Sequence, residues 1–213
     1  MKYIKLFENF EEYDPYELML VSPNDKTEMI FKEIEKKDKA NLDIVNDLIT
    51  LGANLDWQGD KGWTVIHECA HHNHPEILGM LIGAGADLNI QRDDGKTALY
   101  LCSTFNHPEI ARMLIGAGAD VNIQDNRGET ALHECASNND HDIARMLTYA
   151  GADLNIQDEE GNTPLHHAAK VGEEQMIEKL LKFGADGDIK NNRGYTWRAI
   201  WDMGGDFEWE NEE

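Results

Sequence analysis

Short apolar runs alternate with polar, turn-forming segments along most of the chain. Val65 and Ile66 follow Thr64, and a second run with apolar residues at helical spacing begins at Pro75. Threonine is a common helix N-cap, and proline is tolerated in the first helical turn. This pattern predicts two short helices, which we call helix A and helix B. Residues 86–95 are rich in Asp, Asn and Gly, which predicts an extended loop with a tight turn at its tip, here called the finger.

Copies of this pattern follow one another at a period of 33 residues, the step from Gly62 to Gly95. One set of glycines begins the sequence Gly-x-Thr, and a second set precedes alanine at the end of helix B. Asparagine closes helix A in three copies, where it can adopt a left-handed conformation. Such repetition predicts a solenoid in which each unit buries its apolar face against its neighbours. The first set is Gly62, Gly95, Gly128, Gly161 and Gly194, the second is Gly52, Gly85, Gly118, Gly151 and Gly184, and the asparagines are Asn73, Asn106 and Asn139.

Two units carry the sequences Gly-Glu-Thr-Ala-Leu-His at 128–133 and Gly-Asn-Thr-Pro-Leu-His at 161–166. With the Gly-Ala-Asp that follows helix B, these sequences resemble ankyrin repeats, and the resemblance covers about residues 24–205. It implies an all-α fold, an ankyrin-repeat solenoid of stacked helix-turn-helix units with finger-like β-turn loops.

The repeat pattern divides the chain into three parts. Residues 1–23 form an N-terminal non-repeat segment, 24–205 the ankyrin repeat domain, and 206–213 an acidic tail. The domain contains an N-terminal cap pair, four complete repeats and a C-terminal half repeat with helix A only. We expect solvated lysines on the first cap and large rings over the last seam. The cap helices are expected at 27–37 and 42–51, the repeats near Gly59, Arg92, Asp125, Asp158 and Asn191, the solvated residues at Lys32, Glu35, Lys36, Lys37 and Lys39, and the rings at Trp197 and Trp201.

Composition narrows the function classes. The 41 Asp and Glu against 19 Lys and Arg give a net charge of −22, which disfavours binding to nucleic acid. No apolar stretch is long enough to cross a membrane, and residues 1–14 do not resemble a signal peptide. With three cysteines, these features favour a reduced, cytoplasmic location. Leu6-Phe7-Glu8 resembles the Leu-x-Glu sites of tailed-phage prohead proteases, which makes association with a virion an alternative.

Residues 67–71 read His-Glu-Cys-Ala-His, a literal match to the HExxH zinc motif of metallopeptidases. The repeat register favours another interpretation, because His67 occupies the Thr-x-x-His position of His133 and His166, where the ankyrin resemblance implies a structural hydrogen-bonding residue. A zinc hydrolase is therefore a remote alternative. Metal binding by His71, His72 and His74 is a second alternative.

Other reactive side chains have structural explanations. Cys69, Cys102 and Cys135 recur at one helix A position, and stacked helices are too far apart for disulfides, so we expect free, buried thiols. Paired acids such as Asp93-Asp94 fall at finger tips, where solvated carboxylates are common. We therefore expect no enzyme activity, no cofactor and no metal.

Residues that vary between repeats while the surrounding pattern stays fixed indicate a partner-binding surface. In the ankyrin family, these finger and helix A positions line the concave face. Trp63 and Phe105 are large apolar residues at positions that the solenoid does not need for packing, so we expect them to anchor a partner. The complete predicted set is Lys61, Trp63, His71, His72, Asp94, Lys96, Thr104, Phe105, Arg127, Glu129 and Asn138.

The sequence favours a non-catalytic module that binds an unidentified protein as a scaffold, adaptor or inhibitor, with a monomer as the expected state. The alternative is an acidic inhibitor that imitates nucleic acid and blocks a basic protein, as the net charge of −22 suggests.

Overall fold

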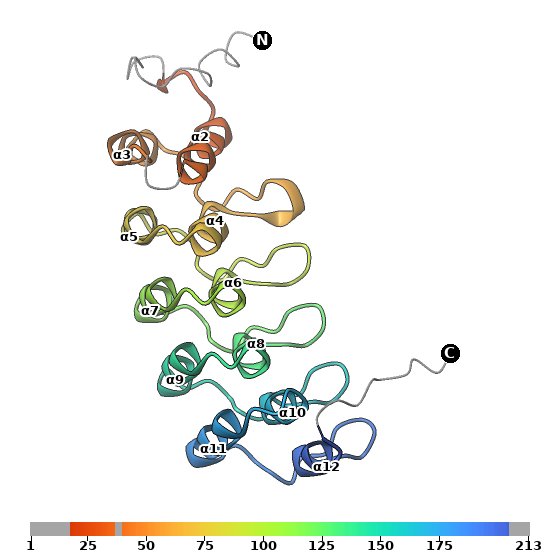
Figure 1. Cartoon of the computed structure of the whole chain (residues 1–213). Helices are drawn as coiled ribbons and strands as arrows, with labels where there is room; N and C mark the ends of the chain where they lie inside the picture. Colours follow the sequence, from red (N-terminus) through yellow and green to blue (C-terminus); the bar gives the residue numbers. More distant parts are fainter. Residues whose placement is uncertain (1–17, 37–39, 205–213) are drawn as a thin grey trace.

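The threonine, proline and asparagine signals coincide with helix ends in the computed structural model, which describes residues 18–36 and 40–204. Pairs of short helices follow one another along the chain (Figure 1), which confirms the expected all-α solenoid. The helices are α2 (Pro23–Glu35), α3 (Leu42–Thr50), α4 (Val65–His72), α5 (Pro75–Gly83), α6 (Ala98–Phe105), α7 (Pro108–Gly116), α8 (Ala131–Asn138), α9 (His141–Tyr149), α10 (Pro164–Lys170), α11 (Glu174–Phe183) and α12 (Trp197–Asp202), with a short 3₁₀ turn, η4 (Asp60–Gly62), in the first finger.

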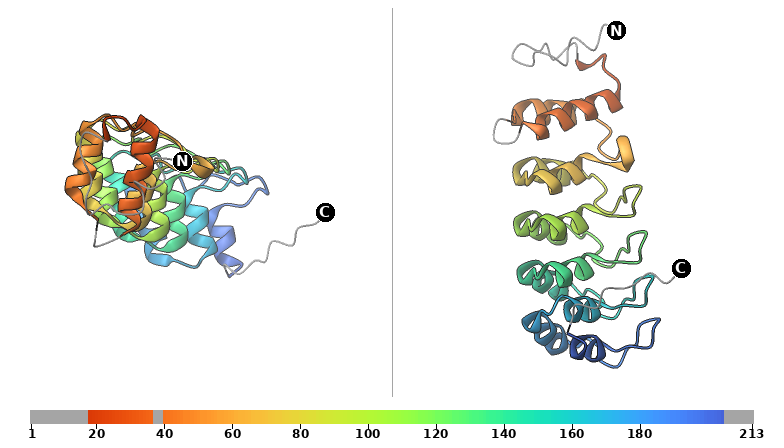
Figure 2. Two further views of the ribbon diagram at one scale, coloured as in Figure 1. Left: turned by 90° about the horizontal axis from the view of Figure 1, so that it is seen from above. Right: turned by 45° about the vertical axis from the view of Figure 1, so that its right-hand side comes forward.

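The helices form two parallel rows. Helices α2, α4, α6, α8, α10 and α12 make one row, and helices α3, α5, α7, α9 and α11 make the other. Each helix of the first row packs on the next, and so do the helices from α3 to α9 in the second. The fingers all project from the side of the first row (Figure 2). The stack bends toward the fingers, so the fingers and the helices A line its concave face (Figure 1).

Each helix A has the ends that its sequence predicts. Thr97 Oγ1 accepts a hydrogen bond from the Tyr100 amide at 3.3 Å, and the other Gly-x-Thr threonines also occupy N-cap positions. Asn73, Asn106 and Asn139 end three of these helices in the left-handed conformation, with φ between 53° and 58°. Short helices are marginal alone, so these caps and the packing between repeats fix their length.

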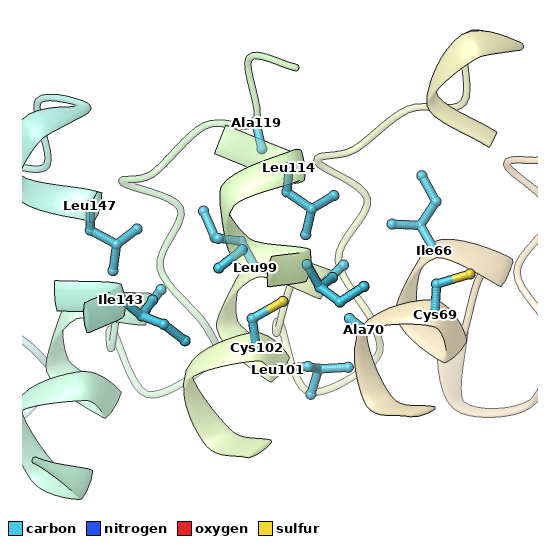
Figure 3. Packing of buried hydrophobic residues seen from close by; sticks show 14 of the residues in the cluster. Ile66, Cys69, Ala70, Leu99, Leu101, Cys102, Leu114, Ala119, Ile143 and Leu147 are labelled. Carbon is cyan, nitrogen blue, oxygen red and sulfur yellow. The ribbon is translucent and has the colours of Figure 1, made fainter. Parts of the chain in front are cut away.

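One continuous apolar core runs between the two rows. Leu99 and Leu114 face each other within the second repeat, Ile66 holds the place of Leu99 in the first repeat, and Leu147 holds that of Leu114 in the third (Figure 3). All four side chains are at most 1% exposed. The cysteines at helix A positions are buried and free, as expected.

The fingers are joined by a ladder of hydrogen bonds that repeats every unit. The side-chain amide of Gln58 donates to the carbonyl oxygen of Gln91, 33 residues later, and Gln91, Gln124 and Gln157 continue the series at 2.9–3.2 Å. Each of these amides also donates to a carbonyl of its own finger. The ladder therefore fixes the shape of one finger and its distance from the next.

The N-terminal cap contains more buried charge than the sequence suggested. Lys32, Glu35 and Lys36 are exposed, as expected, whereas Lys26 and Glu33 are at most 4% exposed. Lys26 Nζ donates to the Leu51 carbonyl at 2.8 Å, and Glu33 accepts from the Asn41 amide at 2.8 Å and from Lys36 at 2.5 Å. These buried charges join α2 to α3 and the turn beyond it. Lys26 and Glu33 share the buried face of α2 with Met29 and Ile30, but charged side chains are seldom buried, so their burial was not expected. Lys37 and Lys39 lie outside the described residues.

At the other end, Trp197 and Trp201 are partly buried against the core, and Ile200 between them is 4% exposed. The expected rings therefore do cover the last seam, although neither is fully enclosed. Residues 206–213 and Leu6-Phe7-Glu8 fall outside the described part of the chain. None of the described helices is long and apolar enough to span a lipid bilayer.

Candidate functional site

The predicted partner-binding residues lie on the fingers and helices A of the first three repeats, where they gather into two clusters. The first is an aromatic cluster formed by Trp63, His71, Phe105 and His107. The ring centre of His71 lies 5.5 Å from that of Trp63 and 4.6 Å from that of Phe105, and His107 follows Phe105 at 6.1 Å. Side chains from two successive repeats therefore form one continuous row of rings.

The two expected anchors differ in exposure. Phe105 is 41% exposed and ends α6 on the open surface. Trp63 is partly buried, because its ring packs against His67 and His71 and the guanidinium carbon of Arg92 lies 4.4 Å from its centre. Trp63 thus contributes to packing between the first two repeats, and Phe105 is the more accessible ring.

The second cluster surrounds Tyr100, which replaces the structural histidine in the second repeat. Its hydroxyl oxygen lies 2.9 Å from a carboxylate oxygen of Glu129 and 2.9 Å from one of Glu134. Arg127 donates to Glu129 at 2.5 Å and lies 3.4 Å from the same hydroxyl. Lys96 Nζ is 4.3 Å from the centre of the tyrosine ring. We call these five residues the tyrosine cluster.

The tyrosine cluster keeps the phenol protonated. Burial raises the pKa of Tyr100 well above its usual range, and the charges of Glu134 and Glu129 raise it further. A neutral phenol has one proton to share between two carboxylates, and Arg127 provides the nearest positive charge. The cluster therefore joins the second and third repeats through side chains.

The remaining predicted residues surround these clusters. Lys61 is exposed at the tip of the first finger with φ +55°, and Asp94 pairs with Arg92. Thr104 is exposed beside Phe105, and Asn138 donates to Glu134 at 3.1 Å. His72 lies at the last turn of α4, where its Nε2 is 3.3 Å from Glu68. These positions cover the same surface, and none of them contributes to the apolar core.

The HExxH interpretation is incompatible with the contacts of His67. Its Nδ1 accepts a hydrogen bond from the Thr64 amide at 3.1 Å, and its Nε2 lies 3.2 Å from the Lys96 carbonyl of the next finger. Both ring nitrogens are therefore occupied inside the seam, and burial lowers the pKa of His67 to about 4. His133 and His166 make the same pair of contacts. The histidine at this position is structural, as the repeat register indicated.

The cysteines offer no activated nucleophile. Burial raises the pKa values of the Cys69, Cys102 and Cys135 thiols, which disfavours the reactive thiolate. Cys135 Sγ donates to Ser103 Oγ at 3.2 Å.

Sequence reasoning missed several residues that shape this surface. Arg92 covers Trp63, His107 extends the aromatic row, and Glu134 completes the tyrosine cluster. Arg92 and Glu134 are the counterparts of Asp125 and Glu68 at repeat spacing, so the sequence predicted where in the repeat they lie. Their contacts could not be predicted, because these depend on side-chain directions. Tyr100 gave the clearest signal, as the one non-histidine among the positions 67, 100, 133 and 166.

The stacked helix pairs and fingers can be compared with known families. The sequence profile described as Ankyrin repeats (3 copies) matches residues 35–125 and 115–191, more than half of the chain. The chain belongs to the ankyrin repeat family. A comparison with curated proteins gives no match. Ankyrin repeat domains generally bind proteins and are typically non-catalytic, and the comparison finds no enzyme family.

Proposed function

We propose that this ankyrin repeat protein is a non-catalytic module that binds a partner protein through its concave face. The observation that carries the proposal is the continuous aromatic row from Trp63 through His71 to Phe105, with the tyrosine cluster beside it. Aromatic and Arg side chains surrounded by polar groups are typical anchors of protein interfaces.

Phe105 is the proposed central anchor. Its ring is 41% exposed at the end of α6, in contact with His71 and His107, and the equivalent residue of the third repeat is the polar Asn138. A large apolar ring at a position where the fold tolerates a polar residue contributes little to folding. Its burial by a partner would remove apolar area from water, which favours binding.

The test begins with a partner captured from the native host and purified. Replacing Phe105 by alanine should weaken the affinity for that partner about 30-fold, or about 2 kcal/mol, as expected for an interface anchor. Trp63→Ala should weaken it as well, but this variant also loses packing against His67 and His71, so its circular dichroism spectrum must be compared with that of the native chain.

Tyr149 provides a matched control. It is an aromatic residue at the end of α9, in the row of helices away from the fingers, and it is 76% exposed. Tyr149→Ala should leave the affinity unchanged. If Tyr149→Ala weakens binding while Phe105→Ala does not, the partner binds the row of helices B and the proposal is wrong.

A second candidate function is imitation of nucleic acid by an acidic surface that blocks a basic protein. Asp87, Asp120, Asp153 and Asp186 are exposed and recur once per repeat, which gives a regular row of carboxylates along the fingers. Binding of this kind should weaken steeply with salt and should be insensitive to Phe105→Ala. A weak salt dependence of partner binding would exclude it.

A further inference from the structure

Three potential metal ligands lie on one face of α4. Glu68, His71 and His72 are spaced i, i+3 and i+4, which places their side chains together on a helix. One ligand atom from each lies within 4.8 Å of the others, and Nε2 of His72 is 3.3 Å from Oε2 of Glu68. Small rotations of the side chains would bring all three to the distances of about 2.0–2.2 Å that zinc requires.

The histidine rings are held in place by their neighbours. His71 packs between Trp63 and Phe105, and the ring centre of His72 lies 4.5 Å from that of His71. These contacts limit the rotation of the rings, and ligands that are already held in place lose less entropy on binding.

The three side chains are accessible from solvent through two grooves. His71 and His72 line a groove of about 940 Å³ at the turns between helices A and B, together with His74 and His107. Glu68 lines a neighbouring groove of about 440 Å³ between α2 and the first finger. An ion can therefore reach the ligands from the surface.

His74 provides an independent sign that the larger groove suits a ligand. Its side chain lines this groove, and the residue is only 8% exposed. Its Nε2 atom is buried and has no hydrogen-bond partner among the described residues. Buried polar atoms are usually paired, so this nitrogen is an unusual feature of the groove wall.

The local charges favour a cation. Glu35 of α2 acts on Glu68 as a second nearby carboxylate. Arg92 is also close, but its charge is paired with Asp94.

We propose that Glu68, His71 and His72 bind one zinc ion at the end of the first helix A. Two imidazoles and one carboxylate suit zinc, and such a set leaves a fourth position for water. The site uses Glu68 and His71 of the HExxH sequence but replaces His67 by His72.

A second group of potential ligands, Glu129, Asp158 and His167, also lies within 4.8 Å, but its members already satisfy one another. His167 Nε2 is 2.8 Å from Asp158, and its Nδ1 is 2.9 Å from Ser137. Asp158 also accepts hydrogen bonds from two backbone amides, and Arg127 forms an ion pair with Glu129. Metal binding there would break all these contacts, which disfavours that group as a metal site.

Titration calorimetry with zinc chloride on the metal-stripped, full-length chain tests the proposal. We expect one ion per chain. Glu68→Gln and His71→Ala should each weaken binding about tenfold or more, because each removes a ligand. His167→Ala, the matched control in the second group, should leave the affinity unchanged. Zinc should also raise the melting temperature of the native chain and not that of His71→Ala.

Two outcomes would overturn the proposal. One is the absence of a stoichiometric zinc site in the native chain. The other is binding that persists unchanged in Glu68→Gln and His71→Ala variants with native circular dichroism spectra, or that disappears in His167→Ala. A gain-of-site variant gives a further check, because Glu134, Ser137 and Asn138 hold the equivalent positions in the third repeat. Replacing Ser137 and Asn138 together by histidine should add a second, weaker site.

Discussion

Tyr100 shows how one side chain can change the way two repeats are joined. In the first, third and fourth repeats, a buried histidine reaches the backbone carbonyl of the next finger at 3.0–3.2 Å. Tyr100 instead places its hydroxyl between the carboxylates of Glu129 and Glu134. The histidine contact needs only a backbone carbonyl, which any residue in the next finger provides. The Tyr100 contact instead needs two glutamate side chains in the next repeat.

Removing that hydroxyl should destabilise the chain. Tyr100→Phe leaves the two carboxylates facing each other without their shared donor, so we expect a loss of about 1.5–3 kcal/mol, the usual contribution of a hydrogen bond to a charged group. Urea unfolding monitored by circular dichroism would measure it. Tyr195→Phe is the control, since Tyr195 is 39% exposed and its hydroxyl makes no hydrogen bond within the described residues. Equal stability of both variants would contradict the role given to Tyr100.

At the residue scale, the sequence predicted positions better than contacts. The caps followed from the residue types at the helix ends, and the structural role of His67 followed from its repeat register together with the ankyrin resemblance. The packing of Arg92 over the Trp63 ring could not be predicted in this way, because it depends on side-chain directions in two neighbouring fingers. For the proposed zinc ligands, helical spacing already places His72 beside Glu68. The packing of His71 between Trp63 and Phe105 instead depends on side-chain directions.

At the scale of elements, the fingers are the most tightly specified part of the repeat. The glycine of Gly-x-Thr has a positive φ in each finger, and in four of the five it also touches the next finger. A Cβ on Gly161 would lie 2.5 Å from Asn192 Oδ1 and 2.7 Å from the Asn192 amide nitrogen. Gly194, in the last finger, has the same conformation with nothing within 4 Å of such a Cβ.

Gly161 and Gly194 therefore separate the two reasons for glycine at this position, which are the positive φ and the close approach of the next finger. Gly194→Ala should lose only about 1–2 kcal/mol, the cost of a left-handed conformation for alanine. Gly161→Ala should lose more, because the added methyl group also forces the next finger away. Thermal unfolding of the two variants tests this, and a larger loss for Gly194→Ala would show that the close approach of the fingers is unimportant.

The elements themselves were largely predictable, since each helix has its own start and stop signals. The cap helices expected at 27–37 and 42–51 are observed at Pro23–Glu35 and Leu42–Thr50. The earlier start of α2 arises at Ser22, whose side chain accepts from the Asp25 amide. That N-cap lies outside the repeat register, so the period could not predict it.

At the scale of the whole molecule, the buried histidines make the stability of the folded chain depend on pH. Burial lowers the pKa of His67 to about 4 and that of His133 to about 3, and it also lowers the pKa of His166. In the unfolded chain these groups bind protons below about pH 6.5. Unfolding therefore takes up protons as the pH falls, and the folded state loses stability between about pH 6.5 and 4. Glu68 and Asp140, whose pKa values burial raises, oppose this trend.

We therefore expect the melting temperature to fall from pH 7 to pH 5, by more than the effect of one histidine. Each depressed histidine contributes up to about 1.4 kcal/mol per pH unit in that window. His133→Gln should make the pH dependence shallower, although its stability at pH 7 will be lower. A melting temperature that is constant over this range would contradict neutral histidines at the seams.

The contrast between Tyr100 and the structural histidines also bears on how such a chain can grow. A histidine that contacts a backbone carbonyl can be followed by any repeat. A second copy of residues 125–157 would therefore keep the contact between each repeat and the next. Copying residues 92–124 would not, because the upstream copy of Tyr100 would then face Lys96 and Leu101 at the places of Glu129 and Glu134. Gene duplication can therefore lengthen the array elsewhere, but the second and third repeats must be inherited together.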